Sequence, residues 1–269
     1  MTASEQRSHE RFAGRWFWRY AAPSKFYPLA GRIEVLCWVV AAVLAVIGLY
    51  VGLFRAPTDF QQGEVYRIIY IHVPASWMAM VIYLAMAFWS AVGFVFGTRL
   101  SFMMSHALAP TGALMAFVSL WTGALWGRPT WGTYWVWDAR LTTTLILFFL
   151  YIGYIALAAA FDDRRKGDRA AGLIAIVGAV NVPIIYFSVK WWNTLHQGAS
   201  VRPGGSSMAT IMLTAMMIMT FAFWAYSIAA AMRRVRTLIL ERERDTAWAR
   251  ELVGAATSGR REAAPMEAR

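Results

Sequence analysis

The sequence predicts an all-α membrane protein with six transmembrane helices, and three observations support this fold class. Apolar residues make up 59% of the 269-residue chain, and charged residues make up only 15%. Soluble domains carry about a quarter charged residues. Six uncharged and mostly apolar runs of 20 to 25 residues cover about half of the chain. A run of about 20 such residues can cross a bilayer as a helix, which satisfies its own backbone polar groups.

The six runs define the expected helices in order and divide the chain into three parts. We expect a cytoplasmic segment at residues 1–34, a membrane domain at residues 35–232 and a basic cytoplasmic tail at residues 233–269. Residues 15–20 alternate arginine with aromatic residues, a pattern typical of an interfacial membrane anchor. The runs are Val35–Phe54, Val73–Gly97, Ala107–Trp126, Leu141–Phe161, Ala170–Val189 and Met208–Met232.

Basic residues are distributed unevenly between the connections, and this predicts the orientation. Of the 26 Lys and Arg residues, 20 lie in the two termini and in the second and fourth connections. The positive-inside rule therefore places both termini in the cytoplasm. Residues 55–72, 127–140 and 190–207 are then expected on the outer side. Because the net charge of +11 follows this topology, no nucleic-acid partner is expected.

Several chemistries are excluded by what the sequence lacks. Cys37 is the only cysteine, so no intramolecular disulfide or CxxC pair can form. None of the three lysines follows a glycine, so there is no GxxxxGK[ST] phosphate loop and no ATPase site of that kind. No charged residue interrupts the six runs, which disfavours an ion-coupled transporter. Asn181, two residues before Pro183, predicts a kink or an interhelical hydrogen bond in the fifth run.

The middle outer connection is rich in aromatic residues. Four tryptophans and Tyr134 fall within residues 126–137. Such a cluster is consistent with an aromatic belt at the membrane surface and equally with a platform for a large flat ligand. Trp131 and Trp135 are four residues apart, so a short helix would place them on one face. Arg128 and Arg140 flank the cluster, where they would pair with carboxylates of a ligand.

One histidine stands beside the membrane in each of the other two outer connections. His72 ends the first of these connections, and His196 lies near the start of the third. Two neutral imidazoles on opposite sides of a planar macrocycle can hold haem iron. By contrast, His9 lies in the polar N-terminus and His106 lies near the cytoplasmic end of a span, so neither is expected to be a ligand.

Three motifs carry a resemblance to a known family over about residues 30–235. WGxxWxWDxRLT at residues 131–142 is similar to the tryptophan-rich WWD signature of haem-handling membrane proteins in cytochrome c maturation. YRIIYIHVP (Tyr66–Pro74) and WWNTLHQG (Trp191–Gly198) resemble the two histidine segments of the family's six-span members. These members are the cytochrome c maturation protein C, or haem exporter protein C, family. Tyr134 departs from the pattern, because many members have another tryptophan there.

The resemblance implies a haem-delivery step at the periplasmic face of a bacterial inner membrane. It implies that haem b is held by His72 and His196 as axial ligands. Arg128 and Arg140 are weaker candidates for contacts with the propionates. The implied partners are a membrane-anchored haem chaperone, a small single-span subunit and an ABC transporter pair of an ATPase and a membrane subunit. The implied platform consists of Trp131, Tyr134, Trp135, Trp137 and Asp138.

Two other classes stay open from the sequence. One is a permease subunit of an ABC-type exporter that moves haem or another solute, and it would need a polar route through the spans. The other is a b-type electron-transfer membrane subunit, which usually buries its histidines within helices. No site of a conventional enzyme is expected, although assistance to covalent haem attachment stays open.

Overall fold

The structure is a computed structural model, and it describes residues 20–262 apart from residues 197, 199–200 and 203. Within this part of the chain, six helical segments are long and apolar enough to cross a membrane. The prediction of a polytopic all-α membrane protein is therefore confirmed. Most of the expected anchor at residues 15–20 lies outside the described residues.

The spans are built from seven α-helices and two shorter helical turns. The first span joins α2 to a π-helical turn at residues 51–55, and the second joins a 3-10 turn at residues 64–68 to α3. A two-stranded antiparallel hairpin precedes the last span. In chain order the elements are α2 (Pro23–Tyr50), α3 (Ile69–Phe96), α4 (Arg99–Trp131), α5 (Ala139–Ala159), α6 (Arg164–Gly178), α7 (Asn181–Trp191), β1 (Val201–Arg202), β2 (Gly205–Ser206), α8 (Thr210–Arg242) and α9 (Ala247–Glu262).

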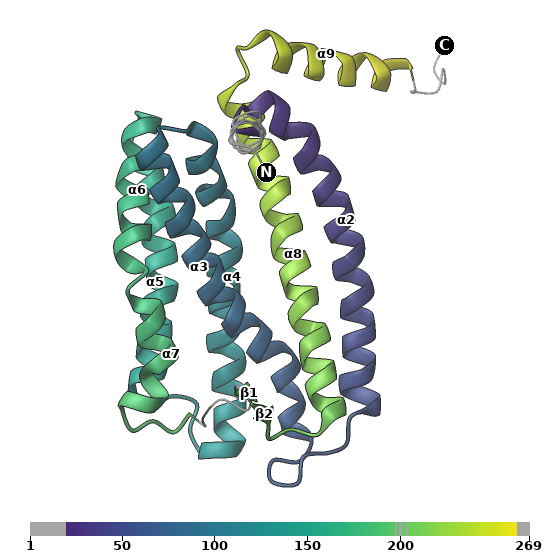
Figure 1. Ribbon diagram of the computed structural model, residues 1–269, viewed down its shortest axis with the longest axis vertical. Coiled ribbons are helices and arrows are strands. Elements are labelled where there is room, and N and C mark those ends of the chain that lie inside the picture. The colour runs from purple at the N-terminus through teal and green to yellow at the C-terminus, as the bar shows by residue number, and fades with distance from the viewer. Residues whose placement is uncertain (1–19, 197, 199–200, 203, 263–269) are drawn as a thin grey trace, which may run out of the picture.

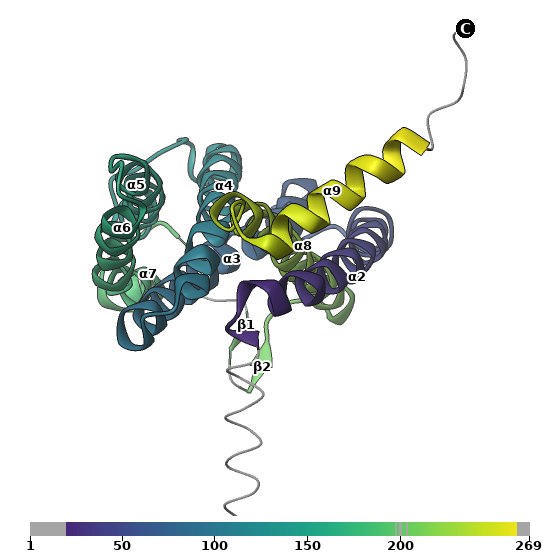
Figure 2. The same cartoon turned by 90° about the horizontal axis from the view of Figure 1, so that it is seen from above.

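The bundle is arranged as neighbouring helix pairs. α2 packs along α8, α3 packs along α4, and α5 lies beside α6 and α7 (Figure 1). Seen from above, α3 and α4 lie between the α5–α7 group and the α2–α8 pair (Figure 2). The start of α2 and the end of α8 lie at one end of the bundle, here called the terminal end. The hairpin lies at the opposite end, here called the site end.

Several helices are longer than the apolar runs that predicted them. α4 and α8 contain 33 residues each, whereas the corresponding runs contain 20 and 25. Hydropathy marks the part of a helix that suits hydrocarbon, but a helix continues until its backbone is capped. Gly97 and Gly132 end α3 and α4 with φ of +65° and +79°, the left-handed conformation that glycine adopts without strain.

Small residues allow the central helices to pack closely around buried tyrosines. The rings of Tyr83 and Tyr151 lie edge to face with centroids 5.0 Å apart. The Tyr151 hydroxyl donates to the carbonyl of Ala79 at 2.6 Å. A Cβ atom at Gly112 would lie 2.2 Å from the Tyr151 ring, so this close approach of α4 and α5 requires glycine. These contacts fix α3, α4 and α5 relative to one another.

The fifth span is interrupted between α6 and α7. α6 ends at Gly178 and α7 begins at Asn181. The Asn181 side-chain amide donates to the carbonyl of Thr143 on α5 at 2.9 Å. The expected interhelical hydrogen bond is therefore confirmed. In consequence, α6 packs against α3, while α7 makes few contacts with it.

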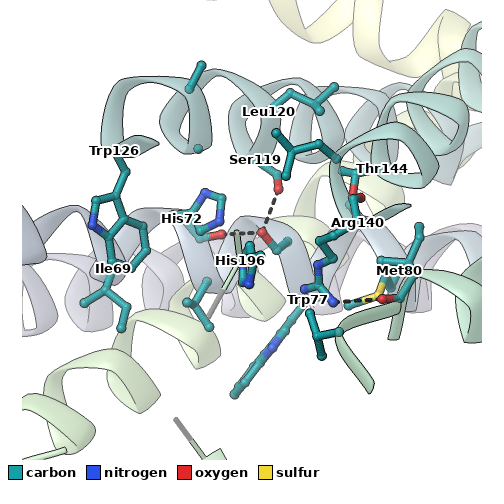
Figure 3. Close-up of a pocket in the computed structure, with 18 of the residues that line it drawn as sticks. Ile69, His72, Trp77, Met80, Ser119, Leu120, Trp126, Arg140, Thr144 and His196 are labelled. Carbon is teal, nitrogen blue, oxygen red and sulfur yellow. Dashed lines mark hydrogen bonds between the residues drawn. The ribbon is translucent and has the colours of Figure 1, made fainter. Parts of the chain in front are cut away.

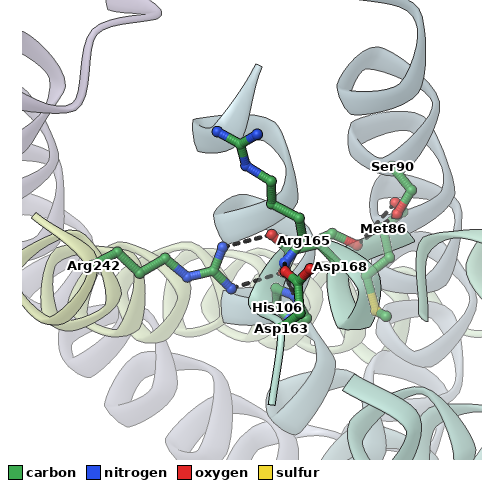
Figure 4. A network of polar contacts seen from close by, with 8 residues as sticks. Met86, Ser90, His106, Asp163, Arg165, Asp168 and Arg242 are labelled. Carbon is green, nitrogen blue, oxygen red and sulfur yellow. Dashed lines mark hydrogen bonds and ion pairs between the residues drawn. The ribbon is translucent and has the colours of Figure 1, made fainter. Parts of the chain in front are cut away.

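A buried ionic network joins α8 to α4 and α6 at the terminal end (Figure 4). Arg242 donates two hydrogen bonds, of 2.7 and 2.8 Å, to the carboxylate of Asp168. His106 Nε2 lies 2.6 Å from the same carboxylate. Three further arginines of α8 pair with other helices, since Arg233 and Arg236 bind Glu34 on α2 and Arg234 donates to Thr111 on α4. His106 thus belongs to a structural network that the sequence did not indicate.

Asp168→Asn should lower the melting temperature of the detergent-solubilised protein. The change leaves Arg242, whose side chain is only 15% exposed, without its carboxylate. Removal of one partner from a buried ion pair costs about 3 kcal/mol or more. Asp245→Asn is the control, because the Asp245 side chain is 92% exposed and pairs only with exposed Arg244 at 3.5 Å among the residues described. Equal melting temperatures for both variants would contradict a stabilising role of the network.

Candidate binding site

His72 lies inside a helix and not at its end. α3 begins at Ile69, so His72 is its fourth residue, and its side chain is 8% exposed. The sequence placed it at the end of a connection because the apolar run was counted from Val73. The ring lies edge to face with Trp126 of α4, with centroids 5.5 Å apart. A Cβ atom at Gly123 would lie 3.0 Å from its Cε1 atom, so glycine there leaves room for the imidazole.

A threonine on α4 holds the His72 ring in one orientation. The Thr122 hydroxyl donates to the carbonyl of Val118 at 2.6 Å, which uses its only proton. Its oxygen lies 3.0 Å from His72 Nδ1 and must therefore accept a hydrogen bond from that nitrogen. In the neutral imidazole, protonated Nδ1 leaves Nε2 with a free lone pair. The geometry thus assigns Nε2 of His72 as the nitrogen available to a ligand or metal.

His196 approaches His72 from the connection between α7 and the hairpin. The centroids of the two imidazole rings lie 6.4 Å apart, and the ring planes are tilted by 33°. The His196 ring also lies 6.2 Å from the ring of Trp131 at the end of α4. Two histidines that are 124 positions apart in sequence therefore face one another at the site end (Figure 3).

This spacing suits two imidazoles on opposite sides of one metal. A ligating imidazole nitrogen lies about 2 Å from its metal and the ring centre about 1 Å further, so two opposed ring centres would lie about 6 Å apart. Within the described residues, no group of three or more His, Cys, Asp or Glu side chains is placed to hold a metal. Two opposed imidazoles are the protein ligands that a metal in a porphyrin can take, since the porphyrin supplies the equatorial ligands.

A cavity of about 730 Å³ surrounds the two histidines. Its walls come from α3, α4, α5 and α7, with Met216 of α8 at one side. Ligand pockets commonly enclose about 300–1,000 Å³, so this cavity accepts a large organic ligand. On α3 the lining residues run from Ile69 to Met80, which is the half of the helix nearest the site end. The site is thus a pocket that enters the bundle, and not only a surface platform.

The structure brings five of the nine predicted site residues to the cavity. These are His72, His196, Trp131, Trp135 and Arg140. Arg140 lies at the start of α5 and donates from Nη1 to the carbonyl of Ile185 on α7 at 2.9 Å. The indole nitrogen of Trp135 is buried without a hydrogen-bond partner in the part of the chain that is described. A ligand oxygen in the cavity would satisfy that N–H group.

The other four predicted residues lie around the cavity and do not line it within the described residues. Tyr134 and Trp137 are 58% and 77% exposed. The Arg128 guanidinium lies 5.7 Å from the centre of the Tyr134 ring and donates to the carbonyl of Gly132. Asp138 caps the first turn of α5, because its Oδ1 atom accepts the N–H of Leu141 at 2.8 Å.

The expected short helix through Trp131 and Trp135 is not formed. α4 ends at Trp131, Gly132 reverses the chain, and residues 133–138 are irregular. Trp135 therefore reaches the cavity from a folded-back loop. Its ring instead lies edge to face with Trp137, with centroids 5.4 Å apart. The spacing of four residues was a misleading signal, because a glycine that ends a helix lay between the two tryptophans.

Sequence reasoning missed three residues that support the site. Trp126 lines the cavity, and its Nε1 atom donates to the side chain of Gln62 at 2.6 Å. Thr122 and Gly123 contact His72 as described above. These three residues have the helical spacing i, i+1 and i+4. The spacing indicates that they share one face of α4, but it does not indicate which residue of another helix they contact. The contact with His72 arises only when α3 and α4 pack together.

The fold and site define a class of protein: a multi-pass membrane protein with a two-histidine, tryptophan-lined pocket suited to a metalloporphyrin. A model of the protein family described as "Heme exporter protein C" matches residues 16–250. The chain belongs to this family.

Curated relatives agree with this assignment. The chain is 43% identical over 233 residues to Heme exporter protein C of Escherichia coli (strain K12), which covers 87% of this chain and 94% of that protein. It is 46% identical over 225 residues to Heme exporter protein C of Bradyrhizobium diazoefficiens, which covers 82% of this chain and 84% of that protein. A putative cytochrome c biosynthesis ccmC-like mitochondrial protein of Marchantia polymorpha is 44% identical to this chain over 188 residues. The matched region covers 70% of this chain and 78% of that protein.

Thr122→Val should weaken the binding of an added ferric porphyrin about tenfold, since partners that orient a ligating histidine affect metal affinity by about 10–100-fold. Valine keeps the shape but removes the acceptor for His72 Nδ1–H. Thr122→Ser retains the acceptor and serves as the control. Absorbance titration of the purified protein measures both affinities. Equal affinities for the valine and serine variants would contradict the assigned role.

Proposed function

We propose that this protein handles haem in cytochrome c maturation by holding it at the periplasmic face and presenting it to a membrane-anchored haem chaperone. The observation that carries the proposal is the pair of opposed imidazoles, 6.4 Å apart, inside a large aromatic cavity. His72 and His196 are the axial ligands of the haem iron in this proposal. Family membership and the names of the relatives support the choice of haem as cargo.

The aromatic residues divide into two proposed roles according to their exposure. Trp126, Trp131 and Trp135 line the cavity and would contact the porphyrin faces. Tyr134 and Trp137 are exposed beside the cavity and would contact the edge of the haem or the acceptor protein. An exposed aromatic rim suits a transfer site, because the ligand must be bound and then released to a partner.

Partners are proposed from the family. An ABC transporter pair of an ATPase and a membrane subunit would supply ATP hydrolysis, because this sequence has no phosphate loop. A small single-span subunit would complete the assembly. The proposed location is the bacterial inner membrane, with both termini and the basic tail in the cytoplasm, in agreement with the positive-inside rule.

A b-type electron carrier is a second candidate, favoured by one observation. His72 lies within α3, as the histidines of such carriers usually do. The two functions differ in what leaves the site, since a carrier retains its haem and exchanges electrons. Transfer of haem to the purified chaperone at equal rates in oxidised and reduced samples would support presentation. Retention of haem with rapid electron exchange would support the carrier.

His72→Ala and His196→Ala should each abolish the six-coordinate, low-spin haem spectrum of the purified protein. Loss of a partner that orients a ligating histidine lowers metal affinity about 10–100-fold. Loss of an axial ligand itself should lower haem affinity by a larger factor. His9→Ala is the matched control, since His9 lies in the polar N-terminal segment. Absorbance spectra and haem titration measure the effect. Wild-type spectra in both single variants would refute the ligand assignment.

Arg140→Gln should weaken haem binding about tenfold, because a hydrogen bond to a charged group contributes about 1.5–3 kcal/mol. Arg140 lines the cavity, and we propose that it pairs with a haem propionate. Arg128→Gln is the control, because Arg128 contacts Tyr134 and Gly132 and does not line the described cavity.

Titration with haem dimethyl ester tests the same contact from the side of the ligand. The ester lacks the propionate charges, so Arg140→Gln should bind it as tightly as the wild type does. Weaker binding of both ligands would show that Arg140 acts through packing and not through a carboxylate contact.

A further inference from the structure

A short chain of hydrogen bonds joins the tryptophan-rich connection to the connection that carries His196. It runs from the Asp138 carboxylate through the Thr194 hydroxyl to the backbone of His196. Asp138 and Thr194 are 56 positions apart in sequence. We call these contacts the Asp138–Thr194 bridge.

The carboxylate end of the bridge is fixed to α5. Asp138 Oδ1 accepts the N–H of Leu141 at 2.8 Å as the N-cap of α5. The second oxygen, Oδ2, accepts the hydrogen bond of the Thr194 hydroxyl. Because one carboxylate oxygen is held by the rigid first turn of a helix, the other is presented to Thr194 in a defined position.

The hydroxyl of Thr194 acts both as a donor and as an acceptor. Its proton is donated to Asp138, and its oxygen accepts the backbone N–H of His196 at 3.0 Å. A threonine that bonds the N–H two residues ahead forms a local turn. The backbone of His196 is therefore tied, through one side chain, to the start of α5.

The two histidines differ in how the fold supports them. His72 lies inside α3, where the helix backbone and Thr122 orient it. His196 follows the end of α7 at Trp191 and precedes β1, and the described residues between these two elements form no helix or strand. A ligand on such a segment must lose more conformational freedom to hold one position. An anchor beside His196 reduces that loss when the ligand binds.

We propose that Asp138 and Thr194 are positioning residues that hold His196 at the sixth coordination position of the haem iron. Asp138 does not line the cavity within the described residues, so its role is to act through Thr194 and not to contact the haem. The bridge also makes the tryptophan-rich connection and the second axial ligand move together. This inference rests on the proposed haem site.

Thr194→Val tests the bridge, because it removes the hydroxyl and leaves the Asp138 cap of α5 in place. In the haem-loaded protein, we expect part of the ferric haem to change from six-coordinate low-spin to five-coordinate high-spin, with about tenfold weaker binding. Added imidazole should restore the low-spin spectrum. Thr194→Ser retains the hydroxyl and should match the wild type. A low-spin wild-type spectrum that persists unchanged in Thr194→Val would overturn the proposal.

Asp138→Ser separates the cap from the bridge. Serine caps helices about as well as aspartate, so α5 should keep its start. Its single side-chain oxygen, however, serves the cap and leaves no second oxygen to accept the hydrogen bond of the Thr194 hydroxyl. We expect the same partial high-spin spectrum as in Thr194→Val, again restored by imidazole. A shift confined to the melting temperature, with an unchanged spectrum, would show that Asp138 acts only as the cap.

Hydrogen–deuterium exchange on the haem-free protein tests the bridge without any ligand. The His196 amide should exchange about fivefold faster in Thr194→Val than in the wild type or Thr194→Ser, since one hydrogen bond contributes about 1 kcal/mol. If the wild type lacks a two-histidine haem spectrum, the proposed function fails. The exchange result would still show whether the Asp138–Thr194 bridge holds the His196 backbone. Equal exchange in all three proteins would overturn the bridge alone.

Discussion

Hydrocarbon offers no hydrogen-bond partners, and this constraint governs where the protein can place irregular chain. Within the bilayer each backbone must bond to itself as a helix, so loops are confined to the two ends of the bundle. The connections that carry Trp135, His196 and Asp138 consequently gather at one end. The connections therefore contribute Trp135 and His196 to the cavity from this end of the bundle, while helices supply most of its other walls.

The two ends of the bundle use polar groups for different purposes. At the terminal end, Asp168 and Glu34 are neutralised by arginines of α8, and this ties the bundle together. At the site end, polar groups orient histidines: Thr122 acts on His72, and Thr194 is proposed to act on His196. One end is stabilised by ion pairs, while the other keeps a cavity that a ligand can enter.

The sequence predicted the fold well because long apolar runs directly identify the helices that can cross a membrane. All six apolar runs correspond to helices long enough to span a bilayer, and Asn181 marks the break in the fifth. Helix ends were less predictable, since Gly97 and Gly132 set them and not the last apolar residue. His72 was expected at a boundary because the apolar run was counted from Val73, but it lies within α3, which begins at Ile69. The basic tail was expected only to indicate which side of the membrane it lies on, yet its Arg242 also pairs with Asp168.

By itself the sequence determined the class of protein and the kinds of residue at its site, because composition and motif depend on local chemistry alone. It indicated His72, His196 and the tryptophan-rich connection. Only the tertiary structure decided which side chains meet. Helix packing set the 6.4 Å between the imidazole rings, turned Trp135 into the cavity and left Trp137 exposed. Such contacts join residues far apart in the chain, and their distances follow from packing that no local pattern encodes.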